Sequence, residues 1–188
     1  MTEVKILHEK NVINKELIIR EGELSEGGKH FTRLGVDRED AAAVFILNTE
    51  TNKVVLTKQF RYPLTFKISE NILEIVAGKV DENEEPLDAA LRETEEETGY
   101  KINNWKIKLL FSCFSTPGYS AERFFIYYAT VTNADKISEG GGKEDENEHI
   151  EVIEMPRGDF DKLIRDGAIQ DAKTYLAGLH LLLNPETE

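Results

Sequence analysis

Carboxylates gather in two parts of this chain of 188 residues. Residues 78–100 hold nine of the 36 acidic residues against Lys79 and Arg92, and residues 139–154 hold seven more against Lys143. Solubility alone does not require this concentration of acid. Hard divalent cations such as Mg²⁺ are bound by carboxylate oxygens. The two clusters therefore indicate a metal site built from two segments of the chain.

The first cluster contains a segment with clear helix boundaries, residues 86–98. Pro86 suits the first helical turn, and Gly99 suits the position just after the last turn. On this helix Glu93 and Glu97 lie one turn apart and flank the inward-facing stripe. That stripe consists of Leu87, Leu91, Thr94 and Thr98. The alternative interpretation of these acids is a solvated helix face.

The charges on this helix are unevenly compensated. Arg92 has Asp88 and Glu96 one turn away on either side, so we expect its charge to be shared between them. Glu93 has no cation among its neighbours on the helix. Like charges one turn apart cost about 0.2–0.5 kcal/mol each in isolated helices. We therefore expect the positive charge that Glu93 and Glu97 need to come from outside the helix.

The spacing of glycines and charges across this region fits one pattern, G-x5-E-x7-R-E-U-x-E-E-x-G-U, in which U is a bulky apolar residue. Its fixed positions are Gly78, Glu84, Arg92, Glu93, Glu96, Glu97 and Gly99. This pattern resembles the Nudix box, the loop–helix–loop signature of hydrolases that cleave nucleoside diphosphates linked to another group. Thr94 and Tyr100 stand at the apolar positions, and we expect Thr94 to turn its methyl group inward.

The resemblance implies roles for the residues of the box. Mg²⁺, or Mn²⁺, would be the cofactor, and Arg92 and Glu84 would orient the carboxylates that hold it. Its ligands would be the carbonyl of Ala77 and the side chains of Glu93, Glu96, Glu97 and Glu146. Glu93, Glu97 and Arg92 are accordingly the candidate catalytic residues of the box. The chemistry agrees, because water approaches a polyanionic pyrophosphate only when the charge on its oxygens is neutralised.

Residues 41–183 outside the box are similar to the ADP-ribose and nucleotide-sugar pyrophosphatase branch of the family. The segments LTKQFRYPL, LEIVAGKVDENEEP, STPGYSAERFFIYYA, GGGKEDENE and the D-x-KT of residues 171–174 carry this similarity, which is strongest to GDP-mannose pyrophosphatases. The substrate-binding residues it implies are Arg33, Arg61, Glu74, Gly78, Glu122 and Lys173. Arg33 would reach the substrate of a neighbouring subunit, and the glutamate that follows it in the family is Leu34 here. Ordinary surface charges are the alternative for Arg61 and Lys173.

The second acidic cluster lies in a glycine-rich segment, GGGKEDENE, at residues 140–148. Such a composition is typical of a solvated loop. In this branch of the family, a loop of this kind brings in the general base that deprotonates water, and closure over substrate makes use of its flexibility. Alignment of the three glycines places that role on Glu146. Two extra residues before the next strand leave Glu144 and Glu148 as candidates.

Composition excludes several classes of protein. The net charge of −13 disfavours nucleic acid and anionic membrane surfaces as partners, because both require clustered Lys and Arg. A single cysteine, Cys113, excludes an intrachain disulfide framework and a cysteine-based zinc cluster. The N-terminal residues lack the apolar core of a signal peptide, and no stretch approaches 18 apolar residues. We therefore expect a cytoplasmic protein.

The expected fold class is α+β, because strand and helix signals mix without a regular alternation. The resemblance sharpens this to an α/β/α sandwich around a mixed sheet, with a small N-terminal β-element that forms a homodimer. We expect the β-element in residues 1–40 and the hydrolase domain in residues 41–188. The expected reaction is Mg²⁺-dependent hydrolysis of a nucleoside diphosphate sugar, with GDP-mannose ahead of ADP-ribose. A non-catalytic nucleotide-sugar-binding module and a house-cleaning (d)NTP hydrolase are the alternatives.

Overall fold

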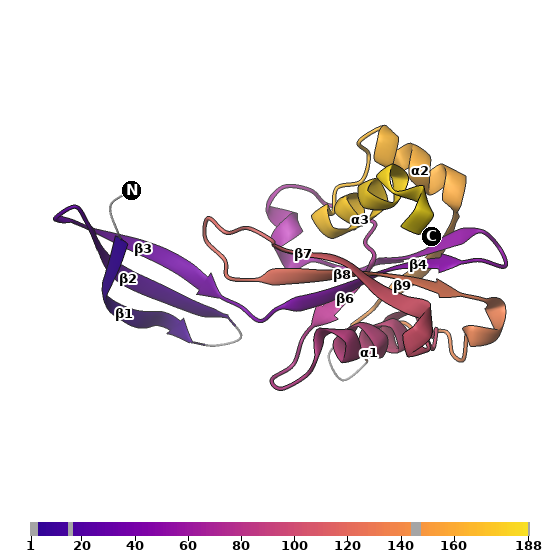
Figure 1. The fold of residues 1–188 in the computed structure, drawn as a ribbon, viewed down its shortest axis with the longest axis horizontal. Helices are drawn as coiled ribbons and strands as arrows, with labels where there is room; N and C mark the ends of the chain where they lie inside the picture. The colour runs from indigo at the N-terminus through magenta and orange to yellow at the C-terminus, as the bar shows by residue number, and fades with distance from the viewer. Residues whose placement is uncertain (1–3, 15–16, 144–147, 188) are drawn as a thin grey trace. The chain divides into compact units, whose positions relative to one another are not determined.

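The computed structural model describes residues 4–14, 17–143 and 148–187. Its contacts group the chain into two compact units (Figure 1). The first unit runs up to Asp40 and includes Cys113–Phe124, and the second consists of Ala41–Ser112 and Phe125–Glu188. Within the described residues, no helix is long and apolar enough to cross a bilayer.

The first unit is an antiparallel sheet with the order β1-β2-β3. The strands are β1 (Val4–Asn14), β2 (Ile18–Glu26) and β3 (Lys29–Asp37). The loop of residues 115–122 closes onto β3, because the backbone of Val36 exchanges hydrogen bonds with Tyr119 and Ala121 at 2.6 and 3.0 Å. The three strands are long, with 11, 9 and 9 residues, and form one paired sheet.

The second unit contains a six-stranded sheet with the order β7-β8-β4-β5-β9, in which β6 also pairs with β4. Its strands are β4 (Ala41–Asn48), β5 (Lys53–Lys58), β6 (Val76–Lys79), β7 (Ile107–Phe114), β8 (Arg123–Val131) and β9 (Glu151–Pro156). Helix α1 (Pro86–Thr98) covers one face of the sheet, while α2 (Arg157–Arg165) and α3 (Ala172–Leu183) cover the other (Figure 1). The expected α+β sandwich is confirmed.

Strand β4 is the centre of this core. Its residues from Ala42 to Asn48 are buried, as expected for a strand covered by helices on both faces. Because side chains alternate along a strand, Val44 packs in the cluster that includes Ala90 of α1, whereas Phe45 meets Phe160 of α2 edge-on at 5.3 Å. The sheet thereby fixes α1 and α3 on opposite faces, and both helices carry residues of the candidate site.

Candidate metal and substrate site

Helix α1 begins and ends where the sequence predicted, at Pro86 and before Gly99. Thr94, which replaces an apolar residue of the box, is completely buried. Its hydroxyl donates a hydrogen bond to the carbonyl of Ala90 at 2.7 Å, so its polar atom is satisfied inside the helix. The expected inward position of Thr94 is therefore confirmed.

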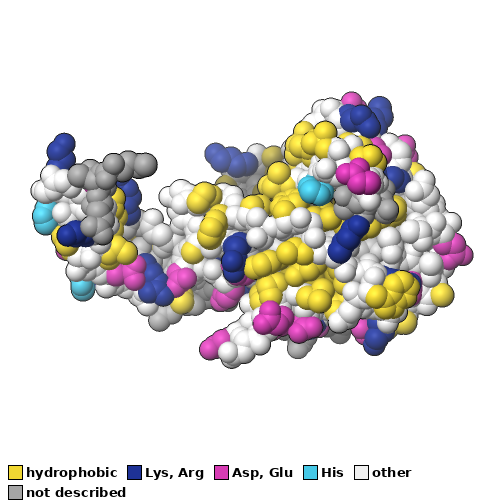
Figure 2. Space-filling model, viewed as in Figure 1, with side chains coloured by type: hydrophobic (Ala, Val, Ile, Leu, Met, Phe, Trp, Pro, Cys, Tyr) yellow, Lys and Arg dark blue, Asp and Glu magenta, His cyan; other side chains and the backbone are white. Residues whose placement is uncertain are grey.

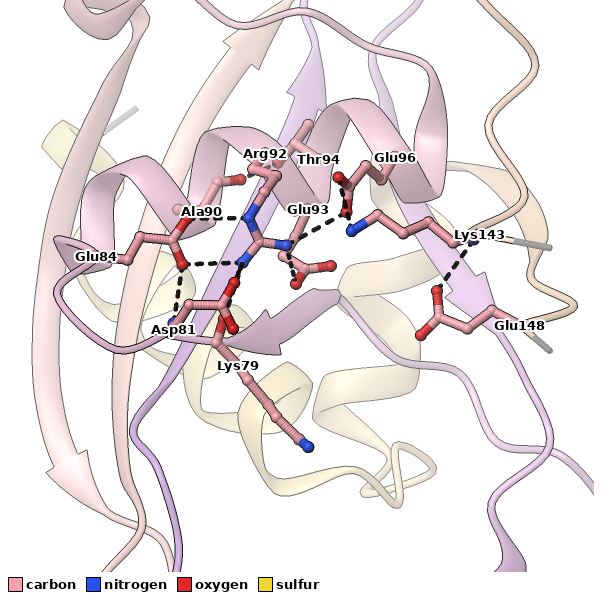
Figure 3. A network of polar contacts seen from close by, with 10 residues as sticks. All are labelled: Lys79, Asp81, Glu84, Ala90, Arg92, Glu93, Thr94, Glu96, Lys143 and Glu148. Carbon is pink, nitrogen blue, oxygen red and sulfur yellow. Dashed lines mark hydrogen bonds and ion pairs between the residues drawn. The ribbon is translucent and has the colours of Figure 1, made fainter. Parts of the chain in front are cut away.

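Arg92 is the centre of an ionic network on α1 (Figure 3). It donates two hydrogen bonds to Glu84, at 2.9 and 3.0 Å, and a third to the carbonyl of Lys79. Its remaining donor contacts Glu93 at 2.6 Å and Glu96 at 3.3 Å. The prediction that no cation of the helix reaches Glu93 is therefore wrong, because the guanidinium fork spans adjacent residues. Arg92 thus contacts both glutamates, and its implied role in orienting them stays a prediction.

Gly78 lies within β6, the strand that passes beneath this network (Figure 3). A Cβ atom at position 78 would overlap the carboxyl group of Glu93. Only glycine lets the helix lay that carboxyl group against the backbone of β6. Ala77, the implied carbonyl ligand, precedes Gly78 in β6 and pairs with Ala43. The box glycine is thus required by close packing of Glu93.

Glu97 lies deepest in the site, with only 2% of its surface exposed. Its Oε2 atom is buried and has no hydrogen-bond partner among the residues that the structure describes. Burial raises the pKa of Glu97 well above its ordinary value; the negative charge of Glu93 adds to this, while Arg61 opposes it. Burial also raises the pKa of Glu93, against the opposing effect of Arg92. The site holds more negative charge than its own cations balance.

A second ionic network contains three of the implied substrate-binding residues. Arg61 donates two parallel hydrogen bonds to Glu74, both at 2.9 Å, and the ammonium of Lys173 lies 3.5 Å from the same carboxylate. Burial opposes the charge of Arg61, but Glu74 outweighs it, so the pKa of Arg61 lies above its ordinary value. Arg61 and Lys173 are thus not free surface charges.

The glycine segment is hydrogen-bonded to the last turn of α1. The backbone N–H groups of Gly141 and Gly142 donate to the carbonyls of Glu97 and Glu96, at 2.8 and 3.1 Å. Gly140, Gly141 and Gly142 all have positive φ angles, from 70° to 111°, a region that favours glycine. The three glycines therefore cap the C-terminus of α1 and start the acidic loop beside its carboxylates.

Residues 143–148 are called the acidic loop, and its described ends, Lys143 and Glu148, lie near the carboxylates of α1. Lys143 forms an ion pair with Glu96 at 3.1 Å, and its backbone N–H donates to Glu148 at 3.3 Å (Figure 3). Glu148 is close enough that its charge raises the pKa values of Glu93 and Glu97. Glu144 and Glu146 lie outside the described residues, so the assignment of the base to Glu146 stays a prediction.

Arg33 and Glu122 belong to the first unit, and their roles in substrate binding stay predictions. Arg33 is exposed and lies over the ring of Phe31, 4.7 Å from its centroid. Glu122 is paired with Arg38 at 3.1 Å. The remaining implied residues (Arg61, Glu74, Gly78 and Lys173, with the box glutamates) belong to the second unit.

The arrangement fits a divalent cation at Glu93 and Glu97. Within the described part of the chain, the buried Oε2 atom of Glu97 has no hydrogen-bond partner, and the half-buried carboxylate of Glu93 lies beside it. A hard cation would neutralise such a pair of carboxylates. Glu96 is engaged with Arg92 and Lys143, and no group of three or more metal-ligating side chains converges in the described part of the chain. Mg²⁺ is commonly held by one or two carboxylates together with substrate phosphates, which matches this pair.

Two residues of these ionic networks, Asp171 and Lys143, were not predicted as site residues from the sequence. Asp171 caps α3 and accepts a hydrogen bond from Lys173 at 2.7 Å. Its signal was present, because aspartate before an apolar helical run marks an N-cap. Lys143 had no comparable signal, because its partner Glu96 is 47 positions away in the chain.

Comparison with known proteins supports the same interpretation. A family model described as the NUDIX domain matches residues 37–177. The GDP-mannose pyrophosphatase of Cronobacter sakazakii is 38% identical over 149 residues, which are 78% of this chain and 75% of that protein. The ADP-ribose pyrophosphatase of Bacillus subtilis is 34% identical over 188 residues and covers 96% of each chain.

A solved structure described as an ADP compounds hydrolase shares the fold. It superposes with a TM-score of 0.78 at 19% identity and covers 100% of this chain and 96% of its own. The residues that the family model matches contain α1, the glycine segment and the first half of α3, so the family model and the site coincide. The chain therefore belongs to the Nudix family and is a hydrolase that acts on pyrophosphate bonds.

Proposed function

We propose that this protein is a Mg²⁺-dependent pyrophosphatase of nucleoside diphosphate sugars, with GDP-mannose preferred and ADP-ribose second. The observation that carries the proposal is the buried carboxylate oxygen of Glu97 beside Glu93, which has no hydrogen-bond partner among the described residues. Arg61 interacts electrostatically with that glutamate, and Lys173 lies beside Arg61 on Glu74. Two cations near an anionic metal cradle suit a substrate with two linked phosphates.

The reaction is hydrolysis of the phosphoric anhydride. The oxygen of water attacks one phosphorus, the bond from that phosphorus to the bridging oxygen breaks, and the two products are a nucleoside monophosphate and a sugar phosphate. Mg²⁺, when bound, would neutralise the phosphate oxygens and polarise the phosphorus. Arg92 would hold Glu93 and Glu96 in place, and a carboxylate of the acidic loop would accept the proton of the attacking water.

A substrate panel tests this proposal. The full chain would be assayed with Mg²⁺ on GDP-mannose, ADP-ribose, other nucleoside diphosphate sugars and dNTPs, with phosphatase coupling to detect the released sugar phosphate. We expect metal-dependent release from one nucleoside diphosphate sugar, with GDP-mannose giving the highest kcat/KM. Highest turnover on dNTPs would instead identify a house-cleaning hydrolase, and no metal-dependent turnover of a folded protein would refute the proposal.

The general base can be identified by single substitutions in the acidic loop. We expect Glu146→Gln to lower kcat by about 10²–10⁴-fold, the usual contribution of a positioned base, with little change in KM. Glu144→Gln and Glu148→Gln should have smaller effects. Steady-state kinetics at several pH values would separate the three, because loss of the base also removes the acidic limb of the rate profile. The largest drop in Glu148→Gln would move the assignment to the glutamate that faces Glu93 and Glu97.

Dimer formation through the first unit is part of the proposal. Strand β1 exposes Val4, Ile6, Leu7, Val12 and Ile13, each by roughly half or more of its surface. Hydrophobic side chains are visible on this unit in Figure 2. An exposed apolar strand of this kind is typical of a protein interface. Sedimentation equilibrium of the full chain should give twice the 21.4 kDa of one chain, and a monomer at all concentrations would exclude the dimer.

A further inference from the structure

The N-terminus of α3 is tied to the segment that carries Glu74. Asp171 accepts hydrogen bonds from the backbone N–H and the hydroxyl of Thr174, at 2.9 and 2.7 Å, and so caps the helix. The completely buried hydroxyl of Thr174 accepts a further bond from the backbone N–H of Ile75 at 2.7 Å. Asp171 thereby joins two segments about one hundred residues apart, next to Glu74.

The second oxygen of Asp171 has a different task. It accepts a hydrogen bond from the ammonium of Lys173 at 2.7 Å, and the side chain of Lys173 is only 13% exposed. A lysine is rarely retracted from solvent in this way. Lys173 is also the second residue of α3, where the positive end of the helix dipole disfavours a cation. Capping alone does not explain why the lysine lies here, whereas the charge of Asp171 does.

Glu74 joins this lysine to Arg61. The carboxylate of Glu74 is nearly buried, receives both hydrogen bonds of Arg61 at 2.9 Å and lies 3.5 Å from the ammonium of Lys173. Two cations thus converge on one carboxylate. Asp171 interacts electrostatically with Arg61 as well as with Lys173. With Asp171 present, the two positive and two negative charges balance, and the cations keep fixed directions.

We propose that Asp171 is a positioning residue that holds Lys173, and through Glu74 also Arg61, in the orientation that binds the pyrophosphate of the substrate. It acts through these cations and does not itself touch the substrate. The inference rests on the proposed function, since it takes Arg61 and Lys173 as the groups that meet the phosphates. Its physical basis is that a preformed pair of cations loses less entropy on binding than two mobile side chains.

Asp171→Asn tests the inference, because asparagine also caps helices well but carries no charge for Lys173. We expect the variant to fold with a small but measurable fall in Tm, because Lys173 loses the charge of its partner, to raise KM about tenfold on the preferred nucleoside diphosphate sugar, and to change kcat less. Loss of a partner that orients a ligand typically costs 10–100-fold in sites of this kind. The matched control is Asp166→Asn at the exposed end of α2, which pairs weakly with Lys162 at 3.8 Å and should change nothing.

A double-mutant cycle with Lys173→Met extends the test, and its shifts in Tm can be measured without turnover. We expect Asp171→Asn to add nothing to the KM of Lys173→Met, and the two single shifts in Tm not to add, because the two changes remove one interaction. An unchanged KM in Asp171→Asn, with active wild type, would overturn the inference and leave the proposed function standing. A wild-type protein without turnover on any of the substrates would refute the proposed function. If the Tm shifts of the two single variants also added in the double variant, the coupling between Asp171 and Lys173 would be overturned as well.

Discussion

Glu97→Gln should abolish turnover and, at the same time, stabilise the metal-free protein. Glutamine has the shape of glutamate but cannot supply the charge that the cation site requires. Loss of several kcal/mol of electrostatic stabilisation in the transition state corresponds to a fall in kcat of about 10³-fold or more. The wild-type carboxylate is buried, and one of its oxygens has no partner in the part of the chain that the structure describes, so its ionised form is costly in the folded state.

The direction of the stability change follows from the raised pKa of Glu97. A carboxyl group whose pKa is higher in the folded than in the unfolded state costs stability as pH rises above its ordinary value. At neutral pH the neutral amide therefore removes a destabilising charge. We expect the Tm of the metal-free variant to rise by several degrees, because 1 kcal/mol corresponds to about 2–4 °C in a chain of this size.

Thermal unfolding with EDTA and with Mg²⁺, measured beside the coupled assay, checks both halves of this prediction. Mg²⁺ should raise the Tm of wild type, because a ligand at a concentration one hundred times its Kd adds about 2.7 kcal/mol to the free energy of unfolding. The Tm of Glu97→Gln should stay nearly unchanged. Glu95→Gln is the matched control, because Glu95 is a half-exposed glutamate of the same helix whose side chain pairs only loosely with Lys101, at 3.6 Å. A variant that keeps turnover, or loses stability without metal, contradicts the assigned role of Glu97.

Gly78→Ala should disable the same site by displacing Glu93. The added methyl group would overlap the carboxyl group of Glu93, so this side chain must move off β6 and away from Glu97. Misplacement of a catalytic group by about 1 Å can cost 10²-fold in rate. We expect kcat/KM to fall by at least that factor, although the substituted residue has no functional group of its own.

Steady-state kinetics and the Mg²⁺-dependent shift in Tm provide the measurement, since displacement of Glu93 weakens metal binding as well as turnover. Gly158→Ala in α2 is the control: its added Cβ meets no atom within 4 Å, and alanine favours a helix over glycine by up to about 1 kcal/mol. That variant should keep full activity and unfold at a slightly higher temperature. Wild-type kinetics in Gly78→Ala would show that Glu93 need not pack against β6.

The elements of the second unit were largely predictable because their signals are local. Helix α1 has the predicted bounds, and β4 was read correctly from its continuous apolar run. The run NILEIVAG at residues 71–78 favours a strand over its whole length, but β6 begins only at Val76, and Glu74 makes an isolated bridge to Thr57. Periodicity does not indicate where a strand loses its neighbour, because pairing depends on the rest of the sheet.

The first unit shows the opposite case. Its first forty residues contain only weak strand signals in the sequence, yet this part of the chain holds three long strands. Of these, β2 and β3 pair from Ile18 and Asp37 to Glu26 and Lys29. Apolar residues on these strands are largely exposed, so the alternation of buried and exposed positions that marks a strand is blurred.

The sequence by itself determined the family, the bounds of α1, and the identity of the carboxylates and glycines of the box, because one helix and its two flanking turns hold them all. Only the tertiary structure decided how their charges are balanced. It placed Lys143 against Glu96 and brought Asp171 and Lys173 to Glu74. The physical reason is that helix geometry relates residues a few positions apart, whereas ion pairs between distant segments depend on how the sheet packs those segments together.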